Sequence, residues 1–230
     1  MKLPTQEDLE ALRQFTTCNV ANAIETLELR LRNEGYTRPG LACPVGSIRP
    51  VVGYAVTSRV RSSDPPITGS RYDDRSDWWE LMGRLPHPQI AVIRDDDPRP
   101  RTGSVLGEIH AAVLKALHCS GVVTDGAVRD LDAIRRLGIP VLANGVAVSH
   151  AYNHMIGFGE PVEIEGLTIQ PGDLLMMDEH GVVSIPLEIA AELPGIAESQ
   201  VRHERRVLAI CSSRDFSLAA LREEIRKVPR

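Results

Sequence analysis

Residues 121–145 read GVVTDGAVRDLDAIRRLGIPVLANG, and this stretch decides the fold class. Gly121–Val123 is short, apolar and β-branched, as expected for a buried strand. A helical pattern runs from Asp130 to Leu137, and PVLANG at Pro140–Gly145 then gives the next strand. Strand–helix–strand order of this kind joins parallel neighbours in a sheet through right-handed crossovers. The stretch therefore predicts an α/β domain.

The segments before this stretch extend the same sheet. PVVGYAVTSRV at residues 50–60 and QIAVIRD at residues 89–95 have the β-branched composition of strands, and a short helix around residues 78–85 separates them. Ser104 is placed to cap a further helix. The apolar face of that helix is expected at Val105, Ile109, Ala112, Val113, Ala116 and Leu117.

The segments after this stretch predict antiparallel hairpins. PVEIEGLTIQPGDLLMMDEHGVVSIP, residues 161–186, alternates short β runs with glycine-containing turns. Asp173 and Asp178 are expected to bind turn amides there and to have no catalytic role. The first thirty or so residues and the chain from Leu187 onward read as helices. We expect one layered α/β domain over residues 1–230, with a mixed sheet in a core at about 51–186 and helices at both ends.

Composition excludes several classes of function. The chain has 230 residues, 43% of them hydrophobic, and a formal net charge of −5, with no massed Lys and Arg that would neutralise a nucleic acid. No apolar run approaches the roughly 20 residues needed to span a bilayer, so we expect a cytoplasmic protein without membrane contact. The four cysteines form no C-x-x-C pair, which argues against zinc and predicts reduced, mostly buried thiols.

Asp125, Arg129 and Asp130 lie where a strand gives way to a helix, a place that favours anions. An arginine there can clamp a carboxylate, and a single Asp can hold Mg²⁺ when water and substrate supply the other ligands. Glu108 lies at the start of the preceding helix, on the same side of the sheet, and could face Arg129. The alternatives are structural: Asp130 caps its helix, Arg129 pairs with a surface acid, and Glu108 interacts with the helix dipole.

Histidines offer weaker candidates. His150 and His154 are four residues apart and would share one face of a helix, as zinc-binding pairs do, but no third ligand or intervening Glu accompanies them. His110 could line a pocket or be a hydrogen-bonded bystander, and we assign it backbone contact only. The absence of G-x-x-x-x-G-K-[ST], G-x-G-x-x-G and G-x-S-x-G sequences removes the usual support for nucleotide-dependent transfer and serine hydrolysis.

Four motifs together resemble a known family, the 4-hydroxy-4-methyl-2-oxoglutarate aldolases, which also contains the regulator of ribonuclease activity A. They are VVGYAVT, GEIHAAV, the 121–145 stretch and PGDLLMMDEHGVVSIP, and they cover about residues 51–186. The resemblance implies a domain of the swivelling β/β/α type that assembles as a homo-oligomer, a trimer or a pair of trimers.

The resemblance also implies a site. Catalytic members carry an acid, then twenty residues, then Arg-Asp, and here Glu108 is followed at that spacing by Arg129 and Asp130. By this likeness, Asp130 would hold Mg²⁺ or Mn²⁺, and Arg129 would contact the keto oxygen and enolate of a 2-oxo acid. Glu108 would deprotonate or position a water that removes the proton of the C4 hydroxyl. The pocket would be lined by Gly107, Glu108, Ile109 and His110, with the backbone N–H groups of the last two on the substrate carboxylate.

The implied reaction is cleavage of a 4-hydroxy-2-oxo acid to pyruvate and a second oxo compound, with oxaloacetate decarboxylation at the same site. A lyase for another 2-oxo acid shares that mechanism. The alternative is a non-catalytic regulator that binds ribonuclease E or another protein, although such members typically lack the acid that Glu108 supplies. The chain departs from the family in having Asn144 where many relatives have Arg and Asn22 where Asp is common. Glu204 is a candidate for an acid supplied to a neighbouring subunit.

Overall fold

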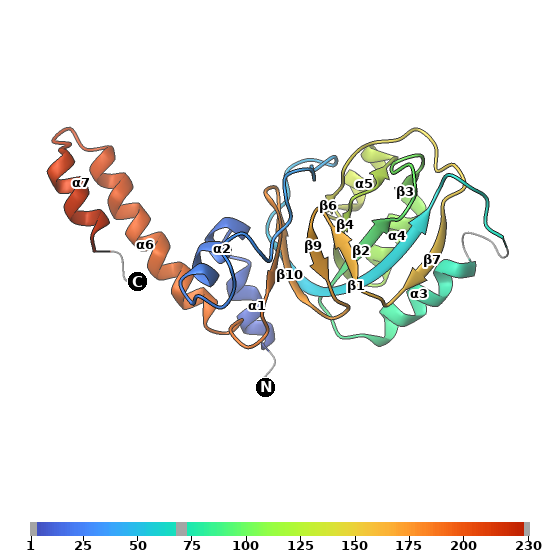
Figure 1. Ribbon diagram of the computed structural model, residues 1–230, viewed down its shortest axis with the longest axis horizontal. Helices are drawn as coiled ribbons and strands as arrows, with labels where there is room; N and C mark the ends of the chain where they lie inside the picture. Colours follow the sequence, from blue (N-terminus) through green and yellow to red (C-terminus); the bar gives the residue numbers. More distant parts are fainter. Residues whose placement is uncertain (1–3, 68–72, 228–230) are drawn as a thin grey trace.

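The computed structural model describes residues 4–67 and 73–227 and contains one seven-stranded mixed sheet at its centre (Figure 1). Its strands are β1 (Val51–Arg61), β2 (Gln89–Asp95), β4 (Cys119–Thr124), β6 (Val141–Leu142), β7 (His154–Phe158), β10 (Leu174–Asp178) and β11 (Gly181–Ile185). They are ordered β11-β10-β1-β2-β4-β6, and β7 pairs with β1 outside this path. The predicted mixed sheet is present, and β2 has the bounds expected from its sequence.

Strands β1, β2, β4 and β6 are parallel neighbours, as the strand–helix–strand order predicts. Three helices join them: α3 (Asp73–Arg84), α4 (Glu108–Ala116) and α5 (Leu131–Leu137). Trp78, Leu114 and Ile134, one from each helix, are fully buried in a shared core with Val122 and Ala91 of the sheet. The three helices therefore cover one face of the parallel strands.

The prediction that Ser104 caps a helix is wrong. Ser104–Leu106 is a short strand, β3, which pairs in parallel with β5 (Ala127–Val128). The helix begins only at Glu108, so Val105 is buried in the strand and Ile109 is 63% exposed. Pairing with a strand distant in sequence overrides the local capping preference of Ser104.

The predicted hairpins are present. β8 (Val162–Ile164) pairs with β9 (Leu167–Ile169), and β10 pairs with β11, both antiparallel. Asp173 accepts a hydrogen bond from the Gln170 N–H (2.8 Å) within a turn, as expected. Asp178 accepts one from the His180 N–H (2.9 Å), but it also reaches the N–H and hydroxyl of Thr17 (both 2.7 Å), 161 residues earlier in the chain.

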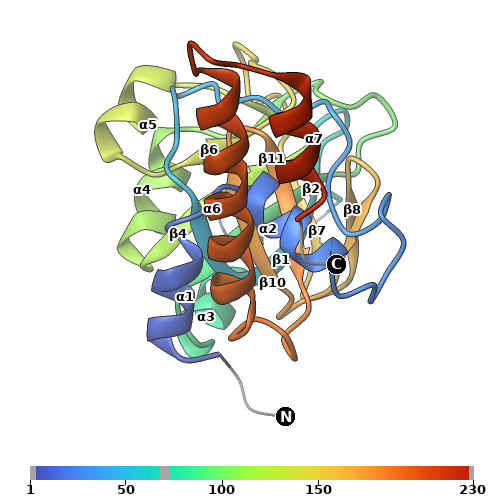
Figure 2. The ribbon, with the colours of Figure 1, turned by 90° about the vertical axis from the view of Figure 1, so that its left-hand side faces the viewer.

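The terminal segments are helical, but the N-terminal pattern is divided into α1 (Gln6–Leu12) and α2 (Thr17–Glu25). The break lies at Thr16, whose side chain caps α2 by accepting from the Asn19 N–H. The C-terminal helices are α6 (Leu193–Cys211) and α7 (Leu218–Ile225). The first turns of α6 pack with α1 and α2, and the rest of α6 extends away from the sheet with α7 alongside it (Figures 1 and 2).

The cysteine prediction is partly wrong. All four thiols are free, but Cys18 on α2 and Cys211 at the end of α6 are exposed, Cys43 is half-buried, and only Cys119 in β4 is buried. The exposed pair lies on the terminal helices, of which α6 projects from the domain. In the part of the chain that the structure describes, no helix combines the length and the apolar character needed to cross a membrane.

The Asp178 carboxylate ties the terminal helix α2 to the sheet, and its loss should destabilise the fold. Burial alone would raise the pKa of Asp178, but hydrogen bonds from Thr17 and His180 outweigh it and hold the pKa below its usual value. Asp178→Ala leaves these donors without an acceptor, so we expect a loss of about 3 kcal/mol in the free energy of unfolding at pH 7.

Because the folded-state pKa of Asp178 is depressed, this stabilisation is present above the carboxyl's unfolded pKa and is lost as the pH falls through the lower folded value. The difference between wild type and Asp178→Ala in urea denaturation should therefore shrink in acid. Asp173→Ala is the matched control, since it removes one turn hydrogen bond, and it should cost less than about 1 kcal/mol. Equal losses in both variants would contradict a special role for Asp178.

Candidate active site

A cavity of about 240 Å³ opens where β3, the start of α4 and the loop between β5 and α5 meet. The six residues that the family resemblance assigns to the site all line this cavity. The cavity is lined by Arg75, Ser104, Val105, Gly107, Glu108, Ile109, His110, Arg129, Asp130, His150 and Asn153. The structure thus brings together the acid, the Arg-Asp pair and the predicted pocket residues Gly107, Ile109 and His110.

Asp130 does not serve as a conventional cap of α5. Its backbone is left-handed (φ 57°, ψ 40°), and its side chain makes no capping hydrogen bond to that helix. Instead, Asp130 Oδ2 accepts from the N–H of Glu108, at the start of α4 (3.1 Å). The left-handed region is uncommon for residues other than glycine, and aspartate is among those that adopt it more readily. Asp130 therefore precedes α5 as predicted, but the prediction that its side chain caps that helix is wrong.

Arg129 is fixed beside Asp130 rather than paired with a distant surface acid. Its backbone N–H donates to Leu106 O (3.0 Å), and its Nε lies 3.4 Å from Asp130 Oδ2. Gly107 makes this approach possible, because a Cβ atom there would lie 2.7 Å from Asp130 Oδ2 and 3.2 Å from Arg129 Nε. Both side chains remain about one-third exposed, so they can reach a ligand.

The N-terminus of α4 faces the same cavity. Among the described residues, the N–H groups of Ile109 and His110 have no hydrogen-bond acceptor, whereas the Glu108 N–H is bound by Asp130. Free N–H groups and the positive end of the helix dipole attract an anion. The exposed Glu108 side chain also lies in the first turn, so its dipole interaction and a role in the cavity are compatible.

The His110 side chain belongs to the floor of the cavity. It lies 5.9 Å from the ring of Trp78 and 5.8 Å from that of Trp79, and its Nδ1 faces Val105 O (3.4 Å). Burial, helped by the positive charge of Arg75, lowers the pKa of His110 to about 3. The ring is therefore neutral, which fits an assignment of backbone contact only.

Two other sequence predictions are not met: Asp125 lies outside the cavity, and His150 and His154 do not form a helical pair. Asp125 pairs with Arg94 and accepts from the Asp95 N–H (2.8 Å), and burial raises its pKa to about 6, but it does not line the cavity. His150 lies in a turn and His154 begins β7, so the helix needed for a zinc-binding pair is not formed.

The cavity can accommodate a divalent ion only with water and substrate as further ligands. Within residues 4–67 and 73–227, no group of three or more His, Cys, Asp or Glu side chains is arranged to hold a metal. Asp130 offers one exposed carboxylate, and hard ions such as Mg²⁺ commonly bind through one or two carboxylates plus waters. The donor set fits a water-rich Mg²⁺ or Mn²⁺ site and excludes a closed protein cage.

No sequence pattern pointed to Arg75 or Asn153, and His150 was a candidate only as a zinc ligand. Arg75 comes from α3, and the other two come from the turn before β7. None is near Glu108 or Arg129 in the chain, so only the tertiary fold places them in the cavity.

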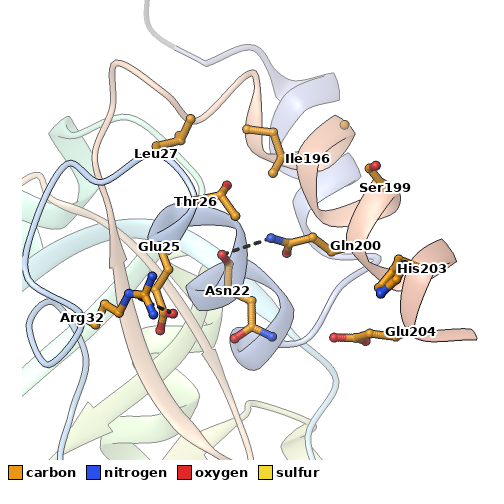
Figure 3. A pocket seen from close by; sticks show the side chains of 11 residues that line it. Asn22, Glu25, Thr26, Leu27, Arg32, Ile196, Ser199, Gln200, His203 and Glu204 are labelled. Carbon is orange, nitrogen blue, oxygen red and sulfur yellow. Dashed lines mark hydrogen bonds and ion pairs between the residues drawn. The ribbon is translucent and has the colours of Figure 1, made fainter. Parts of the chain in front are cut away.

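A second cavity, of about 670 Å³, lies between α2 and α6 (Figure 3). Asn22 and Glu204 both line it, on opposite helices, and Gln200 Nε2 donates to the backbone oxygen of Asn22 (3.2 Å). No residue lines both cavities, so neither of these two candidates meets Glu108 within one subunit. Asn144 also lies outside the first cavity. Its side-chain amide donates to the Glu165 carboxylate.

Residues 17–184 match the family described as RraA-like, Aldolase/RraA. A Halalkalibacterium halodurans protein named "Putative 4-hydroxy-4-methyl-2-oxoglutarate aldolase" is 34% identical over 96 residues, 41% of this chain and 46% of that protein. The matched region thus spans less than half of that relative.

Two solved structures share the fold. An uncharacterized protein from Pseudomonas syringae pv. tomato is 25% identical, with a TM-score of 0.75 over 99% of this chain and 96% of that one. RraAS2 of Streptomyces coelicolor, described as an unusual member of the RNase ES inhibitor RraA protein family, is 23% identical, with a TM-score of 0.68 over 93% and 100%. The resemblance noted in the sequence and the layered α/β fold are both confirmed.

Proposed function

Because the chain belongs to the RraA-like, Aldolase/RraA family, we propose that it is a divalent-metal-dependent lyase that releases pyruvate from 4-hydroxy-2-oxo acids. The observation that carries this proposal is the convergence of Glu108, Arg129 and Asp130 on one cavity, with Asp130 turned away from its own helix.

The substrate is oriented by two cationic or electropositive features of the cavity. Its carboxylate binds the free N–H groups of Ile109 and His110 at the start of α4. The Arg129 guanidinium donates to the keto oxygen, where negative charge develops as the bond to C4 breaks. Since Arg129 is already held beside Asp130, little reorganisation is needed during the reaction.

Asp130 would hold the Mg²⁺ or Mn²⁺ ion, with its carboxylate exposed at the mouth of the cavity. When bound, the ion supplies Lewis-acid stabilisation of the charge on the substrate's oxygen atoms. The N–H of Glu108 and the guanidinium of Arg129 orient the Asp130 carboxylate.

Glu108 takes the proton of the C4 hydroxyl, directly or through a water. The hydroxyl oxygen becomes a carbonyl, the C3–C4 bond breaks, and its electron pair passes to the pyruvyl fragment as an enolate. Protonation of that enolate at C3 gives pyruvate. Oxaloacetate reaches the same enolate by losing CO₂, a step that requires no base.

Aldol cleavage requires a base and oxaloacetate decarboxylation does not, so comparing the two rates distinguishes the role of Glu108 from that of the other residues in the cavity. Glu108→Gln is expected to lower kcat for aldol cleavage about 10²- to 10³-fold, in the range typical of a general base, and oxaloacetate decarboxylation less than about fivefold. Both rates can be measured on one purified sample by coupling pyruvate to lactate dehydrogenase. Equal losses in the two reactions would remove Glu108 as the base.

The proposal as a whole is tested by pyruvate release from 4-hydroxy-4-methyl-2-oxoglutarate and from oxaloacetate, with Mg²⁺ or Mn²⁺ and then with excess EDTA. We expect turnover that EDTA abolishes and added metal restores. If neither substrate yields pyruvate, the lyase proposal fails for these substrates, and a binding role such as the regulation of ribonuclease E becomes the better account.

A further inference from the structure

We propose that His150 is the acid that gives the enolate its proton at C3, in the step that forms pyruvate. The inference rests on the proposed function and deepens it, because that function does not assign the source of this proton. Aldol cleavage and oxaloacetate decarboxylation end on the same enolate, so both need a proton donor after the carbon–carbon bond has broken. The base Glu108 is needed in only one of them.

His150 lies on the wall of the cavity, and a hydrogen bond to the backbone sets its ring tautomer. Its Nδ1 lies 2.6 Å from Ala151 O. A carbonyl oxygen can only accept, so Nδ1 carries a hydrogen and Nε2 is the atom that gains or loses a proton. Among the described residues, Nε2 of His150 has no hydrogen-bond partner, and it is open to solvent. This nitrogen is therefore available to a bound molecule.

The turn that carries His150 is fixed on strand β3. Ser149 O accepts from the N–H of Ser104, the first residue of β3 (2.8 Å). His150 O accepts in turn from the Asn153 N–H (2.9 Å). Gly103 allows the turn to approach this closely, because a Cβ atom there would lie 2.4 Å from His150 O. The backbone on both sides of the imidazole is thus held in place, as a proton-transfer group requires.

The turn and the anion-binding end of the cavity are attached to opposite ends of β3. Ser104, which holds the turn, begins this strand, whereas Leu106 O, at its end, accepts from the Arg129 N–H (3.0 Å). A planar 2-oxo acid whose carboxylate and keto oxygen face α4 and Arg129 has C3 on its opposite edge. C3 is then directed toward the wall to which His150 belongs. The imidazolium Nε2–H bond breaks as a C3–H bond forms, the enolate oxygen becomes the keto oxygen, and water returns a proton to Nε2.

The other ionisable side chains among the described lining residues are less suited to this step. Burial lowers the pKa of His110 to about 3, so its ring is not protonated at neutral pH. Guanidinium groups do not release protons in proteins. Asp130 is assigned to the metal ion and Glu108 to the C4 hydroxyl. His150 remains, and imidazole is the side chain that most often transfers protons in enzymes.

Exchange of the pyruvate methyl protons in D₂O tests the inference, because it requires C3 to lose and regain a proton at the same site. His150→Asn should slow the Mg²⁺-dependent exchange, followed by proton NMR, about a hundredfold. Asparagine is common in turns, and its amide can donate to Ala151 O, so the turn should persist. The Kd for oxalate, a planar analogue of the enolate, should change less than about twofold in calorimetric titrations with Mg²⁺. Oxaloacetate consumption should fall less than about fivefold, because loss of CO₂ precedes the protonation.

Two further variants keep the result interpretable. His154→Asn is the matched control, since His154 Nδ1 also faces a backbone oxygen, that of Tyr152 (2.8 Å), but the residue does not line the cavity. It should exchange as wild type does. His150→Ala serves as the test if His150→Asn does not fold: imidazole added to the buffer should raise its exchange rate, and no increase would overturn the inference.

The outcomes distinguish this inference from the proposed function. Wild-type exchange in His150→Asn, or a loss of oxalate binding as large as the loss of exchange, overturns the role of His150 and leaves the lyase proposal standing. Absence of metal-dependent exchange in the wild-type protein overturns both.

Discussion

Asp130→Asn is expected to lower kcat/KM for pyruvate release about a thousandfold, which corresponds to about 4 kcal/mol of lost transition-state stabilisation. Asparagine retains a side-chain oxygen that can accept from the Glu108 N–H, as Asp130 Oδ2 does now (3.1 Å), so the local fold should persist. What is lost is the negative charge that would hold the divalent ion. Steady-state rates across a Mg²⁺ titration measure the effect.

The matched control for this change is Asp132→Asn. Asp132 lies two residues further along, its side chain is 83% exposed, and it pairs with Arg135 on the surface of α5. This variant should retain wild-type kcat/KM, because surface ion pairs contribute little. If Asp130→Asn also retained full activity, Asp130 would not be the metal ligand.

Gly107→Ala is expected to lower kcat/KM for pyruvate release about tenfold, since the added Cβ shifts two side chains by a few tenths of an ångström and a displacement near 1 Å at a reacting centre costs about a hundredfold. The added Cβ would lie 2.7 Å from Asp130 Oδ2 and 3.2 Å from Arg129 Nε, so both side chains must move. The backbone of Gly107 is extended (φ −136°), a conformation that alanine also adopts, and the melting temperature should change little.

Gly83→Ala is the corresponding control, because a Cβ atom at Gly83, in α3, meets nothing within 4 Å. It should leave kcat/KM unchanged and stabilise α3 slightly. A Gly107→Ala protein with wild-type activity would show that the observed spacing of Arg129 and Asp130 does not matter for the reaction.

The parallel strands were predictable because each is a short β-branched run bounded by glycine, proline or charged residues. Ser104 misled the prediction, since serine is a good helix cap but its backbone here pairs with Ala127 in a neighbouring strand. The helix-capping preference of a single residue contains no information about pairing with a strand elsewhere in the chain. The hydrogen bond from α2 to Asp178 was equally hidden, because Thr17 and Asp178 are 161 residues apart.

The candidate site was predictable only in part. Glu108, Arg129 and Asp130 are found by their spacing, whose meaning comes from the family resemblance rather than from local physics. The sequence favoured Asp130 as a simple helix cap, but its side chain makes no capping hydrogen bond to α5 and accepts instead from the Glu108 N–H. Arg75 and Asn153 come from segments far from this motif, and only the packing of α3 against the sheet brings Arg75 to the cavity.

The proposed reaction requires this cavity to stabilise a pyruvate enolate with the help of a divalent ion. Proton NMR of pyruvate in D₂O tests it most directly, because reversible enolate formation exchanges the methyl protons for deuterium whatever the distal group of the natural substrate. We expect exchange that requires Mg²⁺ or Mn²⁺, stops on addition of EDTA and is absent in Asp130→Asn. Exchange no faster than in protein-free buffer with the same metal would contradict it.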